Sequence, residues 1–199
     1  MKVSAVVLAA GCSSRMGEVK QLLRVDECSI LQRTLENVRA SGADETVLVL
    51  GFAAEAIRRE IPQLLLNAMR VVVNENYESG MASSLRAGVE AVSPAMDAAL
   101  IVLADQPFVR PETMRRLFEF RRDSGAAIVI PFYDGRRGNP VLLDRSIFPE
   151  AMGLSGDVGC RAIFANHSDV TACVEVDDPG ILSDIDTRED YDRLRRGSG

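Results

Sequence analysis

Histidine is nearly absent from this 199-residue sequence, and its scarcity narrows the chemistry available to the chain. His167 is the only histidine, so histidine-based catalytic triads and multi-histidine metal sites are excluded. Cys12, Cys28, Cys160 and Cys173 lie far apart and form no CxxC pair. Neither a zinc site nor a secreted disulfide framework is therefore expected. Any catalysis must rest on other groups.

Lysine is also scarce, because the 23 basic residues include only Lys2 and Lys20. Arginine-rich composition explains the total, but not why one of the two lysines stands in a glycine-rich stretch. A lysine supplies a compact ammonium, which differs from the broad guanidinium of arginine. Lys20 is therefore predicted to have a functional role.

Long apolar runs and excess positive charge are missing as well. No segment approaches the roughly 20 apolar residues that span a bilayer, so we expect a cytoplasmic protein without membrane contact. The net charge is −6, which argues against binding nucleic acid along a broad surface. The length and a hydrophobic content of 47% predict a single domain over residues 1–199, with its core at about 3–194.

Apolar runs alternate with segments of helical periodicity along most of the chain. This alternation predicts an α/β fold with three layers (α/β/α) and a mostly parallel, Rossmann-like sheet. The expected strands are 3–9, 46–50, 71–73, 98–104, 126–130 and 173–176, and the expected helices are 30–40, 53–61, 83–92, 111–122, 146–152, 158–165 and 187–194. The stretch "YDGRRGNPVLLD" is interpreted as a small β hairpin or excursion from the main sheet.

The stretch "LAAGCSSRMGEVK", residues 8–20, leaves the first strand and combines glycines, serines and two cations. Successive backbone amides at 11–14, the hydroxyls of Ser13 and Ser14, and the charges of Arg15 and Lys20 suit a triphosphate. The spacing fits neither GxGxxG nor GxxxxGK[ST], so a NAD site or a P-loop lacks support. A plain strand-to-helix connection is the alternative.

Acidic residues follow two other predicted elements. Asp105 ends the apolar run in "VLADQP", and Asp184 and Asp186 alternate in "LSDIDTREDY" before a helix that Thr187 would cap. Carboxylates at the edge that carries a phosphate loop are suitable ligands for Mg²⁺. An ordinary turn at Asp105, and a helix N-terminus carrying acidic residues, are the alternatives.

Taken together, these motifs resemble a known enzyme family. "LAAGCSSRMGEVK" is similar to the L-A-x-G-x-x-x-R-M-G-x-x-K signature of nucleotidyltransferases with the GT-A-like fold, and "LADQP", "RGNPVLL", "GDVGCR" and "DIDTREDY" resemble motifs of molybdenum cofactor cytidylyltransferases in the same order. The resemblance implies Mg²⁺-dependent (or Mn²⁺-dependent) transfer of CMP from CTP to Mo-molybdopterin, with release of pyrophosphate. It also implies transient contact with a molybdenum hydroxylase.

The resemblance assigns roles by position. Arg15, Lys20 and Asp105 would be catalytic, and Asp105, Asp184 and Asp186 are the candidate metal ligands. The residues implied to bind the nucleotide are Leu8, Ala9, Ala10, Gly11, Cys12, Ser13, Ser14, Arg15, Lys20, Gly80, Ser83 and Ser84. Those implied to bind the acceptor are Gln106, Pro107, Arg137, Gly138, Asn139, Pro140, Gly156, Asp157 and Arg161.

Ala10 carries the expected choice of base. Within the family, L-A-A-G accompanies cytosine and L-A-G-G accompanies guanine, and the extra methyl group would reduce the space beside the base. One methyl group usually contributes only about 1–3 kcal/mol of discrimination. CTP is therefore the expected nucleotide.

Three alternatives remain open from the sequence. The same fold could transfer a nucleotide to another phosphorylated acceptor, or the chain could be a non-catalytic maturation factor that carries the finished cofactor. Some proteins near this branch are NAD(P)-linked oxidoreductases, although the missing GxGxxG argues against that activity here.

Overall fold

The computed structural model describes residues 1–12, 18–164 and 166–197, with side chains in the last helix described up to residue 193. In this part of the chain, eight strands form one mixed sheet in the order β10-β7-β9-β6-β1-β4-β5, and β8 pairs with β7. Their bounds are β1 Val3–Ala9, β4 Glu45–Leu50, β5 Arg70–Val73, β6 Ala98–Leu103, β7 Ile128–Tyr133, β8 Arg136–Arg137, β9 Val141–Asp144 and β10 Thr171–Glu175.

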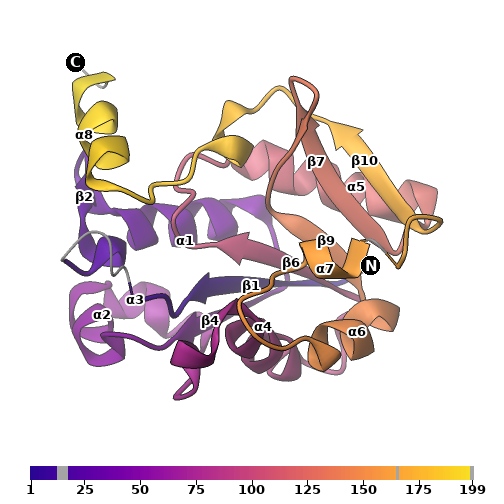
Figure 1. Cartoon of the computed structure of the whole chain (residues 1–199), viewed down its shortest axis with the longest axis horizontal. Coiled ribbons are helices and arrows are strands. Elements are labelled where there is room, and N and C mark those ends of the chain that lie inside the picture. The colour runs from indigo at the N-terminus through magenta and orange to yellow at the C-terminus, as the bar shows by residue number, and fades with distance from the viewer. Residues whose placement is uncertain (13–17, 165, 198–199) are drawn as a thin grey trace.

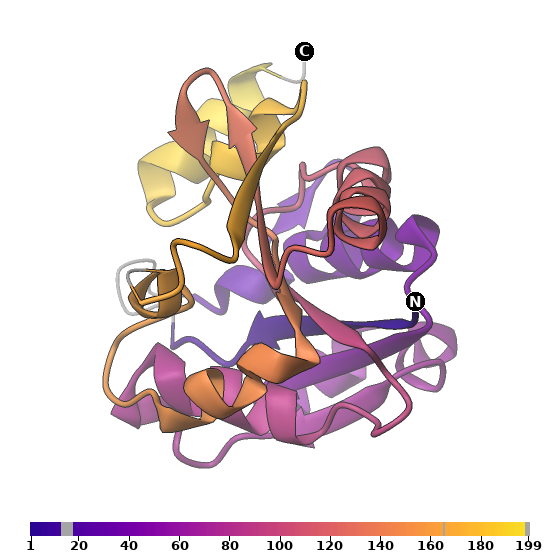
Figure 2. The same ribbon diagram turned by 90° about the vertical axis from the view of Figure 1, so that its right-hand side faces the viewer.

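Helices cover both faces of this sheet (Figures 1 and 2). They are α1 Ile30–Ser41, α2 Ala54–Glu60, α3 Gln63–Leu66, α4 Met81–Glu90, α5 Pro111–Ser124, α6 Phe148–Gly153, α7 Arg161–Phe164 and α8 Arg188–Gly197. Short 3₁₀ helices are η1 Lys20–Leu22, η2 Tyr77–Ser79, η3 Arg145–Ile147 and η4 Pro179–Leu182, and β2 Arg24–Val25 pairs with β3 Cys28–Ser29. None of the helices described is long and apolar enough to cross a membrane.

The period-two pattern of β1 separates two hydrophobic cores. Val3, Ala5 and Val7 lie in the core that packs against α1, α2, α3 and α5, whereas Val6 lies in the core beneath α4, α6 and α7. Side chains alternate between the faces of a strand, so an apolar strand of this kind must be covered on both sides. The predicted three-layer α/β/α architecture is confirmed.

The region after β7 differs in part from the expected excursion. Only β8 extends as a short hairpin with β7, whereas β9 is inserted into the main sheet, antiparallel to both β6 and β7. The reason lies in its composition, because Val141, Leu142 and Leu143 are all buried. Three successive apolar residues need cover on both faces, which an excursion into solvent would not give.

Helix α4 approaches β1 closely at a glycine. A Cβ on Gly88 would lie 2.3 Å from Val6 Cγ1 and 3.0 Å from Val49 Cγ2. We expect Gly88→Ala to lower the free energy of unfolding by about 1–3 kcal/mol through overpacking, despite the better helix propensity of alanine. Chemical denaturation measures this change, with Gly153→Ala as the control because a Cβ there meets nothing within 4 Å. Equal stability of the two variants would contradict the close packing.

The carboxyl ends of parallel strands meet at one edge of the sheet. β1 pairs in parallel with β4 and with β6, and β4 pairs in parallel with β5. The hydrogen bonds continue past the strand ends, since Ala104 N donates to Leu8 O at 3.1 Å and Phe52 N donates to Ala10 O at 3.2 Å. The glycine-rich loop and Asp105 therefore leave neighbouring strands side by side, where ligands commonly bind in such sheets.

Candidate nucleotide site

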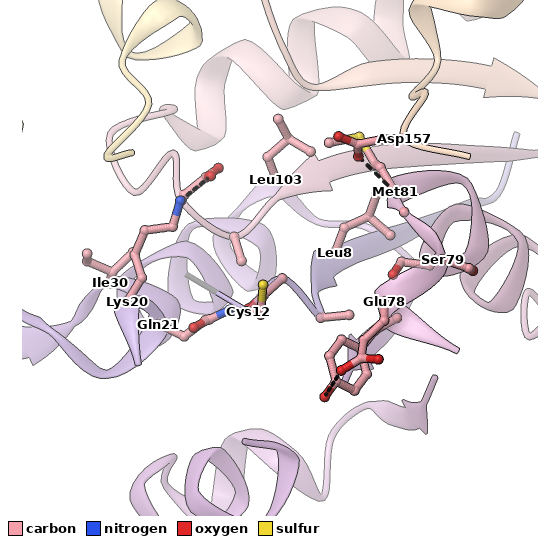
Figure 3. A pocket seen from close by; sticks show the side chains of 17 residues that line it. Leu8, Cys12, Lys20, Gln21, Ile30, Glu78, Ser79, Met81, Leu103 and Asp157 are labelled. Carbon is pink, nitrogen blue, oxygen red and sulfur yellow. Dashed lines mark hydrogen bonds and ion pairs between the residues drawn. The ribbon is translucent and has the colours of Figure 1, made fainter. Parts of the chain in front are cut away.

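A cavity of about 470 Å³ opens at this edge of the sheet. Figure 3 shows Lys20 and Gln21 on one side of it, with Glu78, Ser79, Met81 and Asp157 on the other. The residues that line it come from β1 and the loop after it, η1, the start of α1, η2 and the first turn of α4, the end of β6 with the residues after it, and the loop before α7: Leu8, Ala10, Gly11, Cys12, Lys20, Gln21, Ile30, Tyr77, Glu78, Ser79, Gly80, Met81, Ser84, Leu103, Ala104, Asp105 and Asp157.

Lys20 connects two acidic segments that are distant in the sequence. Its Nζ lies 2.8 Å from Asp105 Oδ2 and 3.0 Å from Asp186 Oδ1. Burial alone would lower the pKa of Lys20, but the charge and hydrogen bond of Asp105, followed by those of Asp186, raise that pKa above its usual value. The ammonium is therefore charged at neutral pH and lies at the cavity wall.

Asp184 occupies a different environment from Asp186, although the two alternate along one extended segment. The Gln106 amide Nε2 donates to Asp184 Oδ1 and, at 3.4 Å, to Ile181 O. Burial raises the pKa of Asp184, and the charges of Asp105 and Asp186 add to the rise, against the lowering effects of the Gln106 hydrogen bond and the Lys20 charge. The residue couples electrostatically to the Lys20 cluster without an ion pair to it.

The backbone of the acidic segment is fixed against β6. Ile185 N donates to Asp105 O at 3.1 Å, which holds the segment beside the strand end. Thr187 caps α8 as predicted, since Asp190 N donates to Thr187 Oγ1 at 3.2 Å and Asp190 Oδ2 accepts from Thr187 N at 2.9 Å. This reciprocal arrangement is a capping box. It fixes the backbone on the C-terminal side of Asp186.

The donor set suits a hard divalent cation. Among the described residues, three carboxylates, those of Asp105, Asp184 and Asp186, interact electrostatically around Lys20, so these four side chains together carry more negative than positive charge. In the described ranges, no three acidic, cysteine or histidine side chains converge as metal ligands. Mg²⁺ needs only one or two carboxylates when substrate phosphates and water complete its shell. The residues therefore fit a metal that binds with a nucleotide.

Gln21 is a structural element of the site that the sequence did not identify. The residue is 4% exposed, and Nε2 donates to Ala9 O and to Gly11 O, each at 3.1 Å. The two carbonyls flank Ala10. The amide thus ties η1, and with it Lys20, to the start of the glycine-rich loop. No periodicity or motif spacing signals such a side-chain contact with the backbone.

At the end of β1, the residues predicted to bind the nucleotide are divided between the cavity and the hydrophobic core. Leu8, Ala10, Gly11 and Cys12 line the cavity, whereas Ala9 lies in the core beneath α1. The Ala9 side chain faces away from the cavity because successive residues of a strand face opposite sides, so only its backbone remains a candidate contact of the nucleotide. Ser13, Ser14 and Arg15 lie outside the residues that the structure describes.

Gly80, Ser84 and Asp157 line the cavity, but Ser83 does not. Buried Asn74, which the sequence did not single out, donates from Nδ2 to Ser83 Oγ at 2.8 Å and to Ser84 Oγ at 3.1 Å. Ser83 Oγ also bonds to Asn76 O at 3.0 Å and Gly80 O at 2.9 Å. The structure therefore gives Ser83 a structural role and leaves Ser84 at the cavity.

The predicted acceptor residues are not all brought together. Asp157 lines the cavity and accepts from Met81 N at 3.3 Å, and Gly156 O accepts from Ala82 N at 3.2 Å. Gln106 is buried beside Asp184. Among the described residues predicted to bind the acceptor, only Asp157 lines the cavity, and the following do not: Gln106, Pro107, Arg137, Gly138, Asn139, Pro140, Gly156 and Arg161.

The 137–140 segment instead packs against the acidic segment. Asn139 N donates to Ile181 O at 3.1 Å, and a Cβ on Gly138 would lie 2.5 Å from the same carbonyl. Arg137 and Arg161 are exposed. This segment therefore supports the backbone that leads to Asp184.

Known proteins resemble the chain over almost its whole length. The MobA-like NTP transferase domain matches residues 5–170. Nicotine blue oxidoreductase of Paenarthrobacter nicotinovorans is 31% identical over 96% of each chain. Molybdenum cofactor cytidylyltransferase of Escherichia coli K12 is 24% identical over 95% of this chain and 93% of its own.

A solved structure shows the same fold. Rv0371c of Mycobacterium tuberculosis H37Rv is 35% identical over 97% of this chain and 96% of its own, with a TM-score of 0.85. A second structure of that protein, described as a complex with manganese, covers 98% of both chains at 33% identity with a TM-score of 0.81.

Proposed function

Because the chain belongs to the MobA-like NTP transferase family and is thus a nucleotidyltransferase, we propose that it is a molybdenum cofactor cytidylyltransferase. The reaction would transfer CMP from CTP to the terminal phosphate of Mo-molybdopterin. The products would be molybdopterin cytosine dinucleotide and pyrophosphate. The similarity to the Escherichia coli cytidylyltransferase over 95% of this chain supports this substrate pair.

The ion pairs of Lys20 with Asp105 and Asp186 carry the proposal. They bring together a cation and two carboxylates from separate segments, and Lys20 and Asp105 line a cavity of about 470 Å³ next to the glycine-rich loop. A nucleoside triphosphate needs charge neutralisation and alignment, and little covalent chemistry from the protein. This composition therefore suits nucleotidyl transfer in a chain that has a single histidine.

The chain's own residues would act mainly by positioning the nucleotide and neutralising the charge of its phosphates. Lys20 would donate to phosphate oxygens as negative charge develops on the departing pyrophosphate, and the Gly11 backbone would approach the phosphates closely. The acceptor phosphate is already anionic. It would attack the α-phosphorus as the bond from that phosphorus to the bridging oxygen of the pyrophosphate breaks, so no general base is required.

Asp105 and Asp186 are the residues that would hold Mg²⁺ or Mn²⁺, because both already face one cation, Lys20. Asp184 is engaged by Gln106 and would act through its charge. The metal, when bound, supplies charge neutralisation to the triphosphate. The manganese complex described for Rv0371c supports a divalent cation in this fold.

The cavity wall around Ala10 would bind the base. Ala10 is 3% exposed, and a Cβ on Gly51 would lie 2.8 Å from Ala10 Cβ and 2.7 Å from Tyr77 Cβ. The space behind the Ala10 methyl group is thus already closed. Ser84 Oγ accepts from Asn74, so its own proton would donate to an acceptor atom of the nucleotide.

Ala10→Gly tests the proposed choice of base. Removing the methyl group should raise kcat/KM for GTP relative to CTP by about tenfold or more, because the wall gains room for a purine. Steady-state pyrophosphate release with each nucleotide measures the ratio, and general damage to the fold cancels from it. An unchanged ratio would assign base selection to other residues.

The function itself is tested by incubating the protein with Mg²⁺, Mo-molybdopterin and each of the four NTPs. We expect pyrophosphate release with CTP and formation of the cytosine dinucleotide. Activity with GTP alone would overturn the cytosine assignment, and turnover only with another phosphorylated acceptor would overturn the pterin assignment. No turnover with any acceptor would favour a cofactor carrier.

The relative named as an oxidoreductase supplies a second candidate, since it is 31% identical over 96% of this chain. The same preparations should therefore be titrated with NADPH and NADH. Binding of either nucleotide together with absence of nucleotidyl transfer would favour the oxidoreductase. The absence of GxGxxG from the sequence weighs against that result.

A further inference from the structure

The ammonium of Lys20 contacts the same carboxylates that would ligate the metal. We propose that Lys20 competes with the divalent cation for Asp105 and Asp186, and that the triphosphate relieves this competition by drawing the ammonium to itself. This inference rests on the proposed function, because it takes the nucleotide and the metal as joint ligands of the cavity. It makes Lys20 a determinant of metal affinity as well as a phosphate ligand.

The carboxylate oxygens of Asp105 leave little room for both the Lys20 ammonium and a metal ion. Asp105 Oδ2 accepts from Lys20 Nζ at 2.8 Å, while Asp105 Oδ1 is enclosed by protein and has no hydrogen-bond partner in the described part of the chain. The carboxylate is 24% exposed, so its accessible oxygen is Oδ2. A metal at that oxygen would lie within a few ångströms of the ammonium, and like charges at that separation repel.

Lys20 can leave the carboxylates without dismantling the cluster. Its backbone is held in η1, where Gln21 anchors the turn to Ala9 O and Gly11 O. The ammonium is carried on a flexible four-carbon side chain that lines the cavity. Rotation of that side chain alone would turn the charge from Asp105 toward phosphates bound at the loop.

The carboxylates would stay in place when the ammonium moves. Ile185 N donates to Asp105 O at 3.1 Å, and Tyr191 Oη, beyond Asp186, donates to Arg24 O at 2.6 Å. Ile185 and Tyr191 are also buried in the small core with Val25. These contacts hold the acidic segment independently of Lys20, so the two carboxylates remain positioned for a metal.

The test measures Mn²⁺ binding to the whole protein by electron paramagnetic resonance, with no nucleotide present. If Lys20 competes, Lys20→Met should bind Mn²⁺ more tightly than the wild type, by about 5-fold or more, the lower end of usual coupling between ligands. Lys2→Met is the matched control, because Lys2 is the other lysine and lies exposed immediately before β1. It should leave Mn²⁺ binding unchanged.

A double variant tests whether the gain arises at the named carboxylates. Adding Asp105→Asn to Lys20→Met should abolish the increase, and thermal unfolding confirms that each variant is folded. Equal or weaker Mn²⁺ binding by folded Lys20→Met would overturn the competition, as would an increase that survives Asp105→Asn. A gain at Asp105 in a protein that transfers no nucleotide would uphold the competition and refute the proposed function.

Discussion

Asp105→Asn is expected to slow pyrophosphate release by about 10²- to 10³-fold, the usual cost of losing one preorganised charge-stabilising group. The substitution keeps the shape of the side chain and removes its charge. Lys20 would then lose its ion pair with Asp105 while keeping that with Asp186, and the metal would lose the carboxylate that lines the cavity. The rate constant at saturating CTP should therefore fall more than CTP binding weakens.

Folding should be largely preserved in this variant, because the Asp105 backbone carbonyl still accepts from Ile185 N. Asp123→Asn is a suitable control, since that carboxylate is 68% exposed and pairs only with Arg122 among the described residues. Single-turnover rates and thermal unfolding should be measured on both variants. A near-normal rate for Asp105→Asn in saturating Mg²⁺ would remove Asp105 from the metal site.

The proximity of Lys20 to Asp105 could be expected from patterns in the sequence. The apolar runs 3–9 and 98–104 predict neighbouring buried strands, and parallel strands end at one edge of the sheet. The structure pairs β1 with β6 and places Lys20 Nζ 2.8 Å from Asp105 Oδ2. Pattern and spacing were sufficient here because Asp105 follows the end of β6 closely, and the loop that leads to Lys20 leaves the end of β1.

Other parts of the site depend on contacts that no local pattern encodes. Gln21 and Asn74 act through buried side-chain amides that bond to a backbone carbonyl or to a serine hydroxyl, and nothing in their neighbours indicates burial. Asp184 and Asp186 share one extended segment, yet one meets Gln106 and the other Lys20. The difference depends on how that segment lies against β6, which is a property of the tertiary structure.

The 137–140 segment shows the same limit at the level of the fold. The expected hairpin is present as β7 and β8, but the apolar run that follows Pro140 joined the interior of the main sheet as β9. The segment was then drawn against Ile181 O and away from the cavity lining. A turn signal shows that the chain reverses there but does not show which surface the turn meets.

Lys20→Met is expected to reduce turnover by about 10²- to 10³-fold, because the departing pyrophosphate loses a preorganised cation. Lys20→Arg should recover only part of the rate, since a planar guanidinium cannot occupy the position where a compact ammonium meets both Asp105 Oδ2 and Asp186 Oδ1. Pre-steady-state pyrophosphate release at saturating CTP separates this effect from weaker binding.

The same variant should bind Mn²⁺ more tightly while turning over more slowly, and this opposition is informative. A simple loss of folding would weaken Mn²⁺ binding and slow turnover. Removal of a metal ligand, as in Asp105→Asn, should also reduce both. Only a group that repels the metal and stabilises the leaving group moves them in opposite directions. If Lys20→Met kept wild-type turnover, the ammonium would have no part in stabilising the charge on the departing pyrophosphate. Its ion pairs with Asp105 and Asp186 would then be structural.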